Sequence, residues 1–205
     1  MCDHGEHGSC SAECHPTPDF FVYDLHQTIE KSKVTVLNEA TEGSGVKVFK
    51  SMDQKNNRTT FVDSDCDEEL LFNIPFAGHV KILGLVISGP SSPSHPARIR
   101  IFKDRPAMSF DDCKIEPDQE IYLKQDPAGV VDYPLKAMKF SNVTHLAIQV
   151  CGNFGDDVTR IYYIGLRGEY QHDFRQKVAI ATYEARPLAE DHKGEIPDTA
   201  ARTLF

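Results

Sequence analysis

The sequence predicts an all-β protein, an antiparallel β-sandwich in which a jelly roll is the favoured arrangement. Three observations support this fold class. Short runs of β-branched and aromatic residues follow one another between residues 34 and 185, Pro- and Gly-rich turns separate them, and helical periodicity is nearly absent. Because parallel strands need long, usually helical crossovers, which the sequence does not provide, the strands are expected to be antiparallel.

The expected strands are short, and each is bounded by turn residues. They span residues 34–39, 46–50, 59–64, 70–76, 80–88, 97–103, 120–124, 131–136, 145–151, 159–168 and 178–184. In the run 97–103, Ile99 and Ile101 face the core if Arg98 and Arg100 face water. The run 82–87 is apolar on both faces, as expected of a strand inside a packed sandwich.

Other parts of the chain depart from this pattern. A weak helical segment is expected over residues 24–32, where Leu25 and Ile29 are four positions apart. Residues 1–18 are polar, and residues 187–205 lose the alternation and gain charge. We therefore expect a β-domain over residues 19–186 between two flexible tails.

Charge and hydropathy exclude two classes of partner. The net charge of −9 argues against binding to a nucleic-acid backbone. Residues 1–20 lack the apolar core of a signal peptide, and the run 80–88 is far shorter than the roughly 20 residues that span a bilayer. The sequence therefore predicts a cytoplasmic protein with access to the nucleus, and no membrane partner. Cys66, Cys113 and Cys151, which lie far apart, are expected to be reduced and mostly buried.

The first fifteen residues hold a cluster of soft metal ligands. The cluster consists of Cys2, His4, His7, Cys10, Cys14 and His15. Zinc or copper accepts such side chains, but their spacing matches no structural zinc module. We interpret the segment as a flexible arm with adventitious zinc or copper affinity, and no cofactor is expected. The alternative is a genuine metal site or a metal-bridged contact with a partner.

Acidic residues gather in a second cluster. Asp63, Asp65 and Asp67 alternate as the first ligands of a calcium loop do, but Glu68 stands where that loop needs glycine and Ile74 where it needs glutamate. An acidic surface that faces a partner is therefore preferred to a calcium site.

Further partner-binding candidates come from the loops expected at one end of the sandwich, 88–96, 108–112 and 152–157, and from the last two residues. They are Asp111, Asp112, Asn153, Asp156, Leu204 and Phe205.

Catalytic motifs are missing from the sequence. It contains no G-x-S-x-G and no C-x-x-C, so neither a nucleophile elbow nor a thioredoxin-type redox pair is present. A Cys–His pair would have to come from Cys66 or Cys151 with His79, His95 or His145. Buried thiols and structural imidazoles explain these residues better, so no enzyme activity is predicted.

Five stretches carry a family resemblance. They are "DSDCDEELLFNIPFAGHVKILGLVISG", "HPARIRIFKDRPAMSFDD", "EPDQEIYL", "KFSNVTHLAIQV" and "NFGDDVTRIYYIGLRGEY". The chain resembles the PITH domain family from about Asp19 to Arg186. This resemblance implies a jelly-roll sandwich similar to galactose-binding-like domains. The PITH domain also forms the C-terminus of a thioredoxin-like protein that associates with the proteasome, which implies binding to the proteasome regulatory particle. The redox half of that protein is absent here, so redox activity is not implied.

The favoured hypothesis is thus a non-catalytic protein-binding module that acts as an accessory or regulatory factor of the proteasome. One alternative is a sandwich that binds a small ligand or carbohydrate. The chain has no Trp for an aromatic platform, although Tyr133, Tyr162, Tyr163 and Tyr170 are available. The other alternative is a metal-binding protein that acts through the N-terminal arm.

Overall fold

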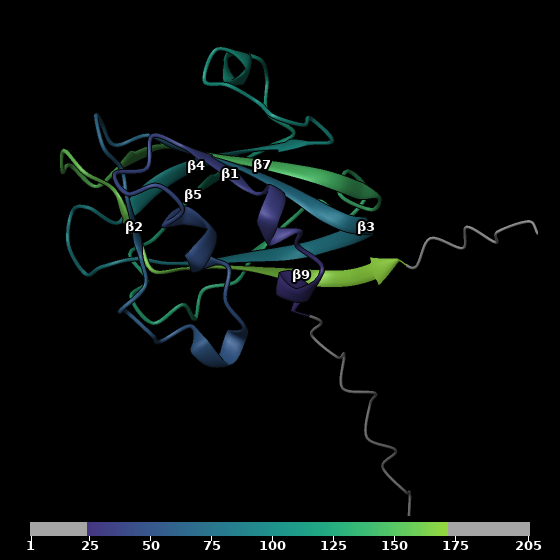
Figure 1. Ribbon diagram of the computed structural model, residues 1–205, viewed down its shortest axis with the longest axis horizontal. Helices are drawn as coiled ribbons and strands as arrows, with labels where there is room; N and C mark the ends of the chain where they lie inside the picture. The colour runs from purple at the N-terminus through teal and green to yellow at the C-terminus, as the bar shows by residue number, and fades with distance from the viewer. Residues whose placement is uncertain (1–23, 172–205) are drawn as a thin grey trace, which may run out of the picture. The chain divides into compact units, whose positions relative to one another are not determined.

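The computed structural model describes residues 24–171, which form an antiparallel β-sandwich (Figure 1). The strands of this part of the chain are β1 (Thr35–Leu37), β2 (Val62–Asp63), β3 (Leu70–Ser88), β4 (Pro96–Lys103), β5 (Gln119–Tyr122), β6 (Tyr133–Pro134), β7 (Val143–Asn153), β8 (Arg160–Ile161) and β9 (Tyr163–Gln171). Short 3₁₀ helices lie between them: η1 (Leu25–Gln27), η2 (Lys31–Lys33), η3 (Gly45–Val48), η4 (Met52–Gln54) and η5 (Asp112–Lys114). Residues outside 24–171 include the two predicted tails and the predicted strand 178–184.

Strand β3 belongs to both layers of the sandwich. Its first half pairs with β1 on one side and β7 on the other, and β4 and β5 extend that layer. Its second half pairs with β9 and β6. The register with β7 shifts between Pro75 and Val80, where the strand bends from one layer into the other. Figure 1 shows the two arms of β3 converging at this bend.

The main core lies between the two layers. Alternate residues of each strand point inward, as the period of two requires. The inward side chains at 1% exposure or less include Leu70, Phe72, Ile74, Leu85, Ile87, Ile99, Ile101, Leu146, Ile148, Val150 and Ile164. Each of these strands therefore contributes to one continuous apolar core, which supplies the main driving force for folding.

A second, smaller apolar cluster covers the outer face of the first layer. Leu71 and Ala147 point away from the main core and are fully buried under the segment 104–118. The Asn73 side chain holds this segment in place, because its amide donates to the Met108 carbonyl and its oxygen accepts from the Met108 N–H, both at 3.0 Å. Burial on two faces explains why the run 70–76 is apolar at successive positions.

The predicted fold class and the inward orientation of Ile99 and Ile101 are confirmed. Several expected elements differ. The runs 70–76 and 80–88 belong to the single strand β3, the run 159–168 is divided between β8 and β9, and the expected helical segment 24–32 is replaced by the separate 3₁₀ turns η1 and η2. The run 46–50 is not a strand but contains η3, because Val48 and Phe49 are buried at successive positions and Phe49 packs edge-on against Phe72.

Gly168 provides a test of the close pairing between β3 and β9. A Cβ at this position would overlap the backbone oxygen of Lys81 and approach Leu25 Cδ1 to 2.9 Å. We expect Gly168→Ala to lower the free energy of unfolding by about 3 kcal/mol, because strand backbone would have to move. Urea denaturation measures this change.

Gly152→Ala is the matched control, since a Cβ there meets nothing within 4 Å. Its expected effect is below about 1 kcal/mol. Equal losses in the two variants would contradict the packing of β9 against β3.

Candidate functional site

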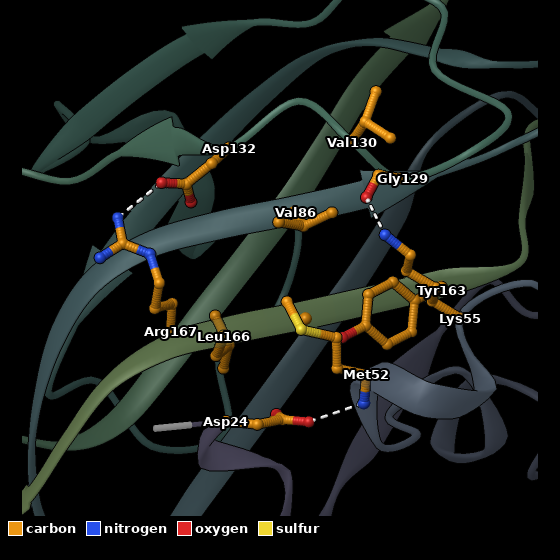
Figure 2. Close-up of a pocket in the computed structure, with 11 residues that line it drawn as sticks. Asp24, Met52, Lys55, Val86, Gly129, Val130, Asp132, Tyr163, Leu166 and Arg167 are labelled. Carbon is orange, nitrogen blue, oxygen red and sulfur yellow. Dashed lines mark hydrogen bonds and ion pairs between the residues drawn. The ribbon is translucent and has the colours of Figure 1, made fainter. Parts of the chain in front are cut away.

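A cavity with a mainly apolar lining lies on the outer face of the second layer (Figure 2). We call it the Tyr163 pocket; its volume is about 330 Å³. The paired strands β3 and β9 form its floor, on which Val86 lies opposite Gly165 and Gly84 opposite Arg167. Its walls come from Asp24 before η1, Met52 and Lys55 around η4, and Gly129, Val130 and Asp132 before β6.

Two glycines in the floor make room for the side chains of the pocket. A Cβ on Gly165 would overlap the ring of Tyr163, approaching its Cζ to 2.7 Å. A Cβ on Gly84 would overlap Asp132 and come within 2.7 Å of Arg167 Nη2. The pocket therefore depends on glycine at both positions.

An ion pair closes one side of the pocket. Arg167 Nη2 lies 2.5 Å from Asp132 Oδ2, so β9 is joined to the loop that precedes β6. Both side chains are partly exposed, which limits the contribution of this pair to stability.

The other polar groups of the walls are bonded as well. Asp24 Oδ2 accepts a hydrogen bond of 2.8 Å from the Met52 N–H, and Lys55 Nζ donates to the Gly129 carbonyl at 3.2 Å. These bonds, drawn in Figure 2, hold η4 and the 129–132 loop against the sheet. The charged groups of the walls are thus directed at one another or at the backbone.

The remaining surface of the pocket is apolar or aromatic. Burial and the nearby Asp24 carboxylate raise the pKa of the Tyr163 phenol, which stays protonated at neutral pH. Met52 and Val130 stand at the rim with 45% and 71% of their surface exposed. The arrangement is suited to holding an apolar group rather than to attacking one.

No sequence motif predicts this pocket. Its ion pair joins Asp132 and Arg167, which are 35 positions apart. The available signal was a glycine inside each of two strands, Gly84 in the run 80–88 and Gly165 in the run 159–168, because an interior glycine indicates close approach of another group.

The acidic cluster does not assemble into a calcium site. Both oxygens of Asp63 bind Arg160, at 2.6 Å each, and this links β2 to β8. Asp67 Oδ1 accepts from the Asn38 amide at 2.7 Å and from the Glu69 N–H at 3.0 Å. Of these three carboxylates, only that of Asp65 is exposed with no hydrogen-bond partner among the described residues except the thiol of Cys66. No group of three potential metal ligands occurs within residues 24–171.

Asn153 organises the neighbouring loop. Its oxygen accepts from the N–H groups of Gly155 and Asp156, both at 2.9 Å, and its amide donates to Thr159 Oγ1 at 3.2 Å. The Thr159 N–H in turn donates to Ser64 Oγ at 2.9 Å. The loops after β2 and β7 therefore meet at one end of the sandwich, where Asp156 is exposed.

Asp111 and Asp112 lie elsewhere, which corrects the expectation that their loop shares this end. They belong to the segment that follows the opposite end of β4 and covers the first layer. Asp112 Oδ2 accepts from Ser109 Oγ at 2.7 Å, and Asp111 pairs with Lys114 at 2.8 Å. Both carboxylates are exposed.

The three described cysteines are free, but the expectation of burial is wrong for Cys66, which is exposed. Burial raises the pKa of Cys151 to about 11 and also raises the pKa of Cys113. The hydrogen bond to the Asp65 carboxylate raises the pKa of Cys66. All three sulfurs are therefore protonated thiols at neutral pH, the less nucleophilic form.

His95 is a structural residue. It is fully buried, its Nε2 accepts from the Asp126 N–H at 3.0 Å, and its Nδ1 lies 2.8 Å from the Pro96 carbonyl. Because Nε2 is an acceptor, Nδ1 carries the proton and the imidazole is neutral. The ring thus joins the start of β4 to the 124–131 loop and does not serve a thiol.

The metal-ligand candidates from Cys2 to His15, and the terminal Leu204 and Phe205, lie outside the described residues. No helix within residues 24–171 is long and apolar enough to cross a membrane.

The family comparison and the related proteins identify the same domain. The model of the PITH domain matches residues 17–187. A PITH domain-containing protein of Caenorhabditis elegans is 60% identical, with 100% of both chains covered. One from Homo sapiens is 46% identical and covers 93% of this chain and 92% of its own.

Among solved structures, the CBM32 domains of a Clostridium perfringens protein in complex with GalNAc align with a TM-score of 0.53 at 9% identity. This alignment covers 71% of this chain and 35% of that one. At such low identity the likeness concerns the fold alone, a β-sandwich.

The burial of His95 predicts a dependence of stability on pH. Burial lowers the pKa of His95 from its usual 6.5, although the nearby Asp126 carboxylate opposes this effect. Below pH 6.5 the unfolded chain binds a proton that the folded protein does not, so stability falls as the pH falls. The loss is at most about 1.4 kcal/mol per pH unit.

Urea denaturation at several pH values between neutral and mildly acidic measures this effect. His95→Gln is expected to be less stable at neutral pH, and to lose less stability than the wild type on acidification. Parallel pH profiles for the two proteins would show that His95 does not titrate as its burial predicts.

Proposed function

This chain belongs to the PITH domain family, and we propose that it is a non-catalytic protein-binding module that associates with the proteasome regulatory particle as an accessory factor. The choice of partner is supported by the resemblance of the sequence to the C-terminal module of the proteasome-associated thioredoxin-like protein. The proposed location is the cytoplasm, with access to the nucleus.

One observation carries the choice of binding over catalysis. In the Tyr163 pocket the charged groups bind one another or the backbone, whereas Met52 and Val130 at its rim are exposed. An apolar side chain of a partner could enter the pocket without leaving a buried charge unpaired. Partner side chains that fill such a pocket, away from water, usually contribute most to affinity.

The acidic end of the sandwich provides a second contact surface for the same partner. Asp65 and Asp156 are exposed on loops joined through Thr159 and Ser64. Exposed carboxylates contribute more to the association rate and to specificity than to affinity. We therefore assign affinity to the pocket and orientation to the acidic loops.

Affinity purification with mass spectrometry tests this proposal. Tagged full-length protein is expected to recover subunits of the regulatory particle from lysate. Val130→Asp should reduce the recovery about tenfold or more, because it places a charge on the apolar rim.

Met138→Asp is the matched control, since Met138 is 94% exposed and does not line the pocket. It should recover as much as the wild type. Absence of regulatory-particle subunits with the wild type would overturn the proposed function. If Val130→Asp recovers as many subunits as the wild type, the pocket is not part of the interface.

A second candidate function is the binding of a small ligand. The volume of the Tyr163 pocket is within the range of about 300–1,000 Å³ found for small-molecule sites. Its partly exposed Arg167–Asp132 pair offers hydrogen bonding to a ligand. Thermal-shift measurements with galactose, GalNAc and other sugars test this candidate, and a flat response across the panel would count against it.

A further inference from the structure

A second cavity, which we call the Lys50 cavity, is lined by several cationic side chains. Its volume is about 450 Å³, and it shares no lining residue with the Tyr163 pocket. Its basic residues are His26, Lys31, Lys47 and Lys50, and the other polar ones are Ser51, Gln54, Asn57 and Thr60. Such a concentration of lysines is unexpected in a chain with a net charge of −9.

Lys50 is the unusual member of this group. Its exposure is 7%, and its Nζ donates to the carbonyls of Asn57 at 2.6 Å and Thr60 at 3.0 Å. An ammonium has three donors, so one is left beyond these two bonds. Burial lowers the pKa of Lys50, as expected for a charge removed from water.

Lys50 has no acidic partner within the described part of the chain. Both of its hydrogen-bond acceptors are neutral carbonyls, and residues 24–171 place no carboxylate oxygen within 4.0 Å of its Nζ. A buried charge without a counter-charge carries a desolvation cost that carbonyl dipoles only partly offset. An anion in the cavity would remove that cost.

The neighbouring charges reinforce the positive field. Lys31 and Lys47 are exposed at the cavity and form no ion pair with a described residue. Two acidic groups that neighbour lining residues in the sequence have partners of their own: Glu30 pairs with Lys33 at 2.5 Å, and Asp24 lies 3.2 Å from His26 Nδ1. The cavity therefore combines one buried cation with two flexible ones.

We propose that the Lys50 cavity binds the phosphate groups of a small anionic ligand. Lys50 would be the buried contact, and Lys31 and Lys47 would flank it. Phosphate suits this arrangement because its oxygens carry more than one negative charge and accept hydrogen bonds from several directions. A lysine contacts it as a point charge without the planar geometry that arginine requires.

Isothermal titration calorimetry on the full-length protein tests this proposal. Inorganic pyrophosphate is the probe, and inorganic phosphate, which has fewer charges, is expected to bind more weakly. Added salt should weaken both interactions because it screens exposed charges. Vesicles of phosphatidylcholine with and without phosphatidic acid, tested by co-sedimentation, distinguish a lipid headgroup from a free phosphate as the source.

Lys50→Met is the decisive variant, since it keeps most of the length of the buried side chain and removes its charge. It should bind pyrophosphate about tenfold or more weakly. Its melting temperature is measured alongside, because the Asn57 and Thr60 carbonyls lose their donor. Lys114→Met is the control, because Lys114 is 79% exposed and pairs with Asp111 outside the cavity. The double variant Lys31→Gln and Lys47→Gln, at exposed positions, provides the test if Lys50→Met does not fold.

Loss of pyrophosphate binding in Lys50→Met or in the double variant, but not in Lys114→Met, supports the Lys50 cavity as the binding site. If the protein binds only the vesicles that contain phosphatidic acid, and the same variants lose this binding, the ligand is a lipid headgroup. The proposal is overturned if the wild type binds neither pyrophosphate nor the acidic vesicles. It is also overturned if the Lys50→Met, Lys114→Met and double variants bind them with equal affinity. The proteasome-recovery experiment varies Val130, which does not line the Lys50 cavity, so the two proposals can fail separately.

Discussion

The fold depends on one strand that is shared by two layers. β3 runs for 19 residues, and its two halves pair with different partners on either side of the bend after Pro75. Its first half carries Asn73, which fixes the segment that covers the first layer. Its second half carries Val86, which lines the Tyr163 pocket, and Gly84, which leaves room for Asp132 and Arg167. The core and the pocket are therefore placed by the same continuous backbone.

The sequence predicts the layers better than it predicts their connection. Alternation and turn residues are local properties, so an antiparallel sandwich follows from them directly. The continuity of β3 does not, because Pro75 and Gly78 resemble the residues of a turn. These positions stay extended because both flanks of β3 pair with β7 and β9, which are more than sixty residues further along the chain.

Functional residues show the same difference between what local patterns predict and what long-range pairing decides. Carboxylates attract notice by their type and clustering, yet Asp63 binds Arg160 across 97 positions and Asp67 caps a neighbouring turn. Their role in the structure is to join loops. The Arg167–Asp132 pair is equally non-local. A sequence pattern identifies which groups could act, whereas pairing between distant segments determines which of them remain available.

The two cavities share a wall, and this gives the proposed sites a physical connection. Met52 of η4 lines the Tyr163 pocket, whereas Gln54 of the same turn lines the Lys50 cavity. Asp24 contacts both sides, since it accepts from the Met52 N–H at 2.8 Å and lies 3.2 Å from His26 Nδ1. An occupant that moves η4 would change both cavities at once. We therefore expect binding in one cavity to alter affinity in the other, and the coupling must be reciprocal.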